Sequence, residues 1–108
     1  MTITEAIQSF PGLEDVPGNY LTKVLTDRSV SDGTVDYTLS HKATVELCAA
    51  DCYVAIVASP DFSEGKLSIK MSRGEMLSRA RSLYLNNGEA ANANNLAVGK
   101  GSAKANWW

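Results

Sequence analysis

The chain has 108 residues, 44% of them hydrophobic, and a formal net charge of −2. This composition fits one small globular domain, and the charge argues against a general nucleic-acid binder, which carries a basic excess. No apolar run is long enough to cross a bilayer, and residues 1–5 lack the basic and apolar regions of a signal peptide. We therefore expect a protein that stays in the cytoplasm of the cell that makes it.

The first third of the chain predicts two short helices. Thr2 and Glu5 have the spacing of a capping box, and apolar residues follow at helical intervals until a Pro-Gly pair at positions 11 and 12. A second helix is expected from an N-cap at Asn19 to about Asp27. Turn-forming residues then lead to residue 36.

The third predicted helix is the longest, from residues 38–40 to about Ser59. Apolar residues recur every three or four positions from Leu39 onward, and the second half is apolar nearly all round, which places it at the centre of the core. Asp51 interrupts this pattern. It either pairs with Arg79 or Arg81 or lies at an exposed edge, and we favour the exposed edge because buried ion pairs are costly to form.

A short amphipathic strand is predicted after the turn at residues 60–65. Its side chains alternate, with Leu67, Ile69 and Met71 on one side and Lys66, Ser68 and Lys70 on the other. A single strand is rarely stable by itself, and lysines are typical of strand edges that avoid promiscuous pairing. We therefore expect this segment to pair with a neighbouring chain.

The last predicted helix begins at a capping box, Ser72 to Glu75, and ends at Gly88, which is suited to a left-handed cap. From residue 89 onward Ala, Asn, Gly, Lys and Ser dominate, which predicts a flexible tail. The only tryptophans, Trp107 and Trp108, stand at its last two positions. They are either incidental or an anchor buried in a partner, and we favour the anchor because tryptophan is a frequent hot-spot residue.

Together these elements predict a mainly α fold. We expect a bundle of about four helices over residues 1–88, with one short extended strand between the last two helices, and a flexible Ala/Asn/Gly-rich tail over residues 89–108.

No pattern in the chain indicates catalysis, a metal site or a cofactor. Cys48 and Cys52 share one helix face, but a single histidine leaves too few ligands for a metal. That histidine, His41, lies about two helical turns from Cys48, too far for a Cys–His nucleophile. Residues 99–102 match only part of a phosphate loop. The basic residues between positions 66 and 81 are expected to form a solvated face rather than a nucleic-acid site.

Several segments carry a family resemblance. They are, in order, Phe10-Pro11-Gly12, Leu21–Arg28, Tyr37–Ser40 leading into Val45–Tyr53, and Ser59–Gly65 with the strand and helix that follow. Over residues 1–89 the chain resembles small helical proteins of tailed phages and prophages that are similar in layout to head–tail connector (neck adaptor) subunits.

The resemblance implies a non-enzymatic virion subunit, made in the host bacterial cytoplasm. Such subunits form a homo-oligomeric ring between the portal protein and the tail or neck proteins, and packaged DNA passes through the ring. The resemblance implies no cofactor, no membrane partner and no sequence-specific nucleic acid, and Lys66–Met71 matches the segment that would pair with a neighbour. The alternative is a small helical nucleic-acid-binding or regulatory module; a small enzyme is the least favoured hypothesis.

Overall fold

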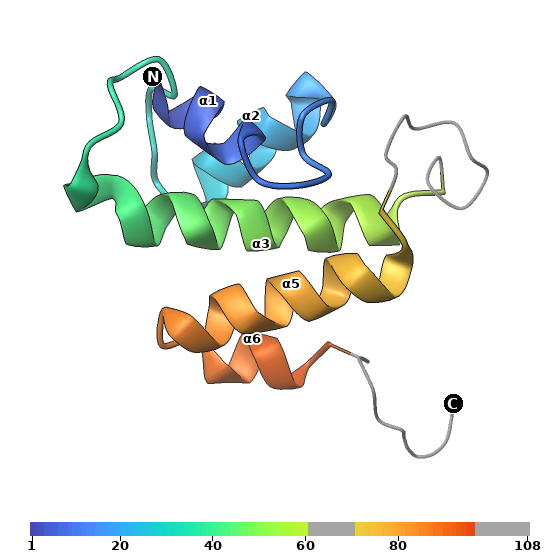
Figure 1. The fold of residues 1–108 in the computed structure, drawn as a ribbon. Helices are drawn as coiled ribbons and strands as arrows, with labels where there is room; N and C mark the ends of the chain where they lie inside the picture. Colours follow the sequence, from blue (N-terminus) through green and yellow to red (C-terminus); the bar gives the residue numbers. More distant parts are fainter. Residues whose placement is uncertain (61–70, 97–108) are drawn as a thin grey trace, which may run out of the picture.

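The computed structural model describes residues 1–60 and 71–96, which form a mainly helical fold in layers (Figure 1). Helices α1 (Ile3–Gln8) and α2 (Gly18–Asp27) cover one side of the long central helix α3 (Lys42–Ala58), and α5 (Arg73–Asn86) packs along its other side. A short helix, α6 (Ala90–Asn94), packs against α5. The predicted mainly α fold is confirmed.

Both predicted capping interactions begin helices. The Thr2 hydroxyl oxygen accepts a hydrogen bond from the Glu5 backbone N–H at 3.1 Å, and the Glu5 carboxylate accepts one from the Thr2 N–H at 2.7 Å. At the start of α5 the Ser72 hydroxyl accepts from the Glu75 N–H at 3.1 Å. Gly88 follows α5 with φ +79°, the left-handed conformation that glycine adopts without steric cost.

Two predicted helix starts are wrong in detail. Helix α2 begins at Gly18 rather than after Asn19, because Pro17 caps it and the Pro17 carbonyl accepts from the Tyr20 N–H at 3.0 Å. A 3₁₀ turn over Leu39–His41 precedes α3. A 3₁₀ helix has 3.0 residues per turn instead of 3.6, so Leu39 is out of register with the apolar face of α3. Leu39 is therefore 82% exposed instead of buried in the core.

The tail prediction is wrong for residues 90–94, which form α6. Ala93 is fully buried, and Leu96 packs partly buried against the core. The small alanine side chain allows α6 to approach α5 closely. The residue before α6, Glu89, is also held to the end of α2 by an ion pair described below.

The predicted interface residues fall mostly outside the described residues: Lys66, Leu67, Ser68, Ile69, Lys70, Trp107 and Trp108. Met71 is described, in a bend before α5 and partly buried against the core. Within residues 1–60 and 71–96 the only β pairing is an isolated antiparallel bridge between Thr2 and Asp36. It ties the loop after α2 back to the start of α1.

The core is concentrated on the second half of α3, as its all-round apolar sequence predicted. The largest fully buried side chains among the described residues come from α1, the following turn, α3 and α5: Tyr53, Ile7, Leu13, Ile56, Met76, Cys48 and Cys52.

Candidate functional site

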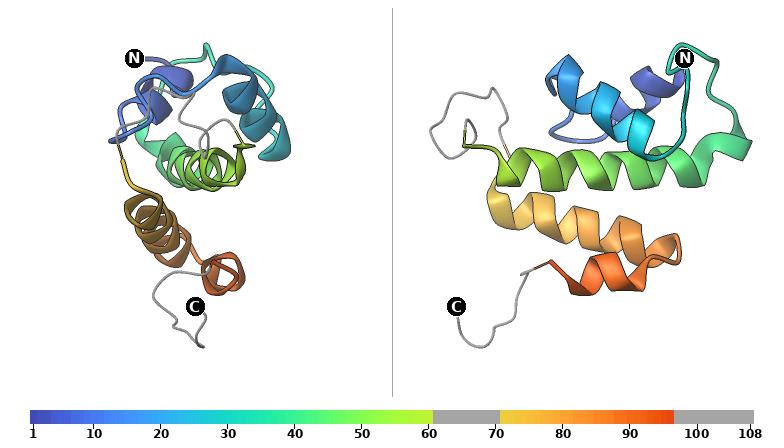
Figure 2. Two further views of the ribbon diagram at one scale, coloured as in Figure 1. Left: turned by 90° about the vertical axis from the view of Figure 1, so that its right-hand side faces the viewer. Right: turned by 180° about the vertical axis from the view of Figure 1, so that it is seen from behind.

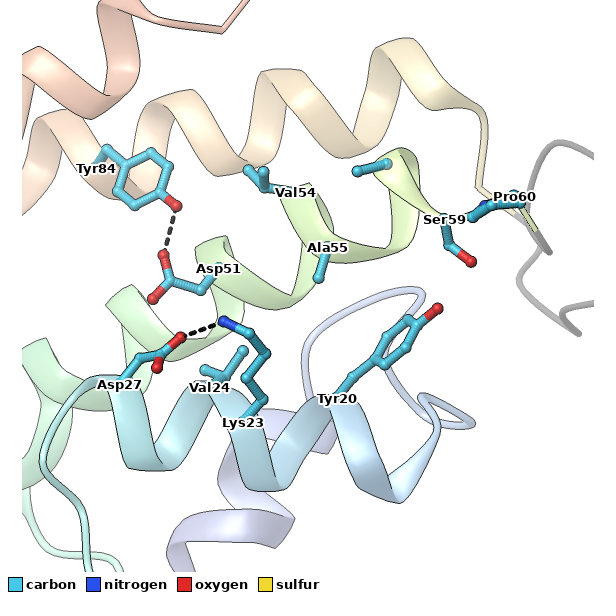
Figure 3. Close-up of a pocket in the computed structure, with 11 residues that line it drawn as sticks. Tyr20, Lys23, Val24, Asp27, Asp51, Val54, Ala55, Ser59, Pro60 and Tyr84 are labelled. Atoms are coloured by element: carbon cyan, nitrogen blue, oxygen red, sulfur yellow. Dashed lines mark hydrogen bonds and ion pairs between the residues drawn. The ribbon is translucent and has the colours of Figure 1, made fainter.

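A groove runs between α2 and α3, and we call it the α2–α3 groove (Figure 3). Its volume is about 480 Å³, and its lining residues are Tyr20, Lys23, Val24, Asp27, Asp51, Val54, Ala55, Ala58, Ser59, Pro60 and Tyr84. Its floor is an apolar stripe of α3, in which Val54 and Ala55 are half-buried and Ala58 is exposed. The Lys23 ammonium lies 2.6 Å from the Asp27 carboxylate, but both side chains are largely exposed, so this pair contributes little to stability.

The polar groups at one end of the groove are paired within the chain, in what we call the Arg28 cluster. Arg28 forms two hydrogen bonds to the Asp51 carboxylate, at 2.7 Å and 3.0 Å, and two to the Glu89 carboxylate, at 2.6 Å and 3.0 Å. The Tyr84 hydroxyl donates to Asp51 at 2.5 Å. The cluster connects the end of α2, the middle of α3, the end of α5 and the residue before α6.

The cluster corrects the expectation for Asp51, which is neither at an exposed edge nor paired with Arg79 or Arg81. Its side chain is 22% exposed, and its partner is Arg28. The bond from Arg28 lowers the pKa of Glu89 below its usual value of 4.5. Burial, with the hydrogen bond to Asp51, raises the pKa of the Tyr84 hydroxyl. Arg28 therefore holds the Glu89 carboxylate in its charged form, and the hydrogen bonds that it donates to Asp51 and Glu89 raise the pKa of the Arg28 guanidinium.

A second hollow lies beside Tyr53, and we call it the Tyr53 pocket. Its volume is about 280 Å³, and it is lined by Phe10, Tyr53, Ser78, Arg79, Ser82 and Leu83. The Tyr53 hydroxyl donates to the Pro11 carbonyl at 2.5 Å, which fixes the ring against the turn after α1. Burial raises the pKa of Tyr53 to about 12, so its hydroxyl stays protonated and donating at neutral pH.

The groove and the pocket open on opposite sides of α3. Tyr53 and Ala55 are two positions apart, which on a helix of 3.6 residues per turn points them about 200° apart. The end-on view in Figure 2 (left) agrees, with α1 and α2 on opposite sides above α3, and with α6 on the same side as α2. The pocket belongs to the α1 side and the groove to the α2 side.

The family model for a family of unknown function, DUF6706, matches residues 1–107. The chain belongs to this family. No curated protein and no solved structure matches it. The family match includes most of the segment after residue 96.

The two cysteines of this DUF6706 member are buried. Cys48 and Cys52 are free thiols with no exposed surface, and burial raises their pKa values to about 11 and about 12. In the part of the chain that the structure describes, no three or more His, Cys, Asp and Glu side chains gather in a way that could hold a metal ion. None of the helices in this part is both long enough and apolar enough to cross a bilayer.

Sequence reasoning did not identify either hollow. Of the eight predicted interface residues only Met71 is described, and it packs against the core beside Gly12. The signal that could have found the groove is the all-round apolar second half of α3. The helices beside it cover only part of its circumference, so Val54, Ala55 and Ala58 stay partly in contact with solvent.

Proposed function

We propose that this protein is a non-enzymatic structural subunit of a tailed-phage virion, a head–tail connector (neck adaptor) that forms a homo-oligomeric ring between the portal protein and the tail or neck proteins. The observation that supports self-assembly most directly is the pair of hollows on opposite sides of α3. The resemblance of residues 1–89 supplies the virion context. The subunit is made in the host bacterial cytoplasm and then incorporated into the particle.

Hollows on opposite sides of one subunit suit a head-to-tail arrangement. When a contact joins two different surfaces of identical chains, each copy still offers one free surface of each kind, so the contact repeats until the rotation closes a ring. The half-exposed floor of the α2–α3 groove supplies apolar area for such a contact. The alternating sequence of Lys66–Met71, most of which lies outside the described residues, predicts a segment that pairs with a neighbour.

The groove is tested by placing a charge on its floor. Ala55→Glu adds a carboxylate at a half-buried position that points away from the core, whereas Ala43→Glu makes the same change at an exposed position near the start of α3. A carboxylate buried in a subunit contact without a partner is costly. Sedimentation of wild type should show a large oligomer that A55E weakens about tenfold or more, a change of about 1.4 kcal/mol. A43E should assemble like wild type, and equal assembly of all three would exclude the groove as a contact.

The alternative function predicts a different result in the same preparations. A small helical nucleic-acid-binding or regulatory module would bind DNA with an affinity that falls steeply as salt rises. A monomer with such an affinity would contradict the connector proposal. Mass spectrometry of purified virions tests the virion context directly, since a connector must be present in them at constant copy number.

A further inference from the structure

The Tyr53 pocket is sized and lined for one large apolar side chain. Its volume of about 280 Å³ lies just below the roughly 300 Å³ at which pockets for drug-sized ligands begin. Phe10 and Leu83 form apolar walls, and Tyr53 fills the base with its hydroxyl already bound to Pro11. The pocket therefore offers aromatic and aliphatic surface.

Arg79 adds a positive charge at this pocket. Its side chain is exposed, and it forms no hydrogen bond or ion pair with another described residue, unlike Arg28 and Arg73. A guanidinium stacks on aromatic rings, and the indole of tryptophan is the best partner for such a cation–π contact. An aromatic occupant would therefore contact both the apolar walls and this cation.

The chain itself contains such an occupant. Its only two tryptophans, Trp107 and Trp108, follow a spacer of small and polar residues that has two lysines and no acidic residue. The match to the family model runs through this spacer to residue 107. Tryptophan is one of the residues enriched among interface hot spots.

The position of α6 favours a neighbouring copy over the same copy as the source of the tryptophans. The last described residue, Leu96, follows α6, which lies on the α2 side of the molecule (Figure 2, left). The Tyr53 pocket opens on the other side, with α5 between them. If the α2 side of one copy faces the α1 side of the next, the spacer after Leu96 begins beside the Tyr53 pocket of the neighbouring copy. Eleven residues from Leu96 to Trp107 extend at most about 40 Å.

We propose that the Tyr53 pocket of one copy binds the Trp107–Trp108 segment of the neighbouring copy. This inference rests on the self-association in the proposed function and assigns it a specific contact. Only the few residues next to the tryptophans need become ordered with them, since each further residue fixed adds an entropic cost.

Tryptophan fluorescence tests the contact directly, because excitation beyond the tyrosine absorption reports only on Trp107 and Trp108. For wild type we expect blue-shifted emission at concentrations where sedimentation shows the oligomer, and emission typical of exposed indole after dilution. Ser82→Asp places a carboxylate in the pocket from an exposed position and should abolish the blue shift. It should also weaken self-association about 30-fold or more, the usual threshold for a hot spot. Asn86→Asp, an exposed change with the same charge on α5, should behave like wild type.

Two further experiments separate the possible failures. Phe10→Ala removes a wall contributed by a different element and must give the same loss as S82D, with helical circular dichroism retained. Mixing S82D with the double variant W107A/W108A should form a mixed pair, because each supplies what the other lacks. A blue shift independent of concentration, with no mixed pair, would show binding within one chain and overturn the proposal. An oligomer with exposed tryptophans would overturn this contact alone, whereas a monomer at every concentration would overturn the proposed ring as well.

Discussion

The two sides of α3 differ in how their charged groups are used. On the α2 side, one arginine holds two carboxylates and brings four segments of the chain together. On the Tyr53 side, the hydroxyl of Tyr53 is bound to a backbone carbonyl, and Arg79 has no ion-pair partner among the described residues. The charges on the first side stabilise the subunit, while the charge on the second is available to a ligand. Hydropathy alone does not distinguish these sides, because α3 is apolar on both.

The Arg28 cluster also explains why the chain continues into α6. Glu89 lies just before α6, and Arg28 fixes it to the end of α2 and the middle of α3. The Asn92 side-chain amide, one turn later, donates to the same carboxylate at 2.7 Å. A five-residue helix is too short to be stable in isolation, so these contacts and the burial of Ala93 hold it in place.

The largest expected effect is on the α2 side. Arg28→Met keeps much of the side chain's apolar length but leaves Asp51 and Glu89 without their cation in a site where both are partly buried. Removing one partner of a fully buried ion pair costs about 3 kcal/mol or more. Because these carboxylates are partly exposed, urea unfolding followed by circular dichroism should show a loss of up to about 3 kcal/mol in the free energy of unfolding. Lys23→Met breaks an exposed pair on the same helix and should give no measurable change. Equal effects of the two substitutions would show that the cluster is only a surface network.

The contrast between these two ion pairs also shows what can be predicted from sequence. The pair of Lys23 and Asp27 is separated by one helical turn. The capping box at Thr2 and the side-chain cap at Ser72 each span three residues, so local spacing reveals these interactions. Arg28 and Asp51 are 23 positions apart, and Arg28 and Glu89 are 61 apart. Only the packing of α2 across α3 brings them together.

The same limit applies to α6 and to the two hollows. The composition of residues 89–96 resembles a linker, and its helix depends on Glu89 being held by a distant arginine. The groove and the pocket arise where two neighbouring helices leave a gap beside α3. Helical periodicity in the sequence predicts which residues share a face of α3, but it does not predict how much of that face the neighbouring helices cover. The sequence therefore predicted the helical class and most helix ends, but not the candidate site.

A matched pair of substitutions compares the two sides directly. Tyr84→Phe removes a hydrogen bond to the Asp51 carboxylate, and Tyr53→Phe removes one to the Pro11 carbonyl. Hydrogen bonds to charged groups contribute more than neutral ones, so we expect losses of about 2 kcal/mol and about 1 kcal/mol respectively in the free energy of unfolding. Tyr20→Phe serves as the control, because its hydroxyl has no hydrogen bond to another described residue. A larger loss for Y53F than for Y84F would reverse our ranking of the two sides.

The smallest expected effect concerns Glu89 and depends on pH. The folded pKa of Glu89 lies below 4.5, so the folded state favours the charged carboxylate. The resulting stabilisation is fully present above the unfolded pKa and is lost as pH falls through the folded value. Near pH 7, Glu89→Gln should therefore lower the free energy of unfolding by up to about 1 kcal/mol, within the range for partly exposed pairs. The difference from wild type should shrink as the pH falls from 4.5 through the lower folded value.

A double-mutant cycle decides whether this pH dependence comes from Arg28. In the Arg28→Met background the Glu89 carboxylate has lost the cation that lowers its pKa, so Glu89→Gln should cost little at any pH. If the substitution costs the same with and without Arg28, then Asn92 and the start of α6 hold the carboxylate by themselves. The α2 side would then be joined to α6 by packing rather than by charge.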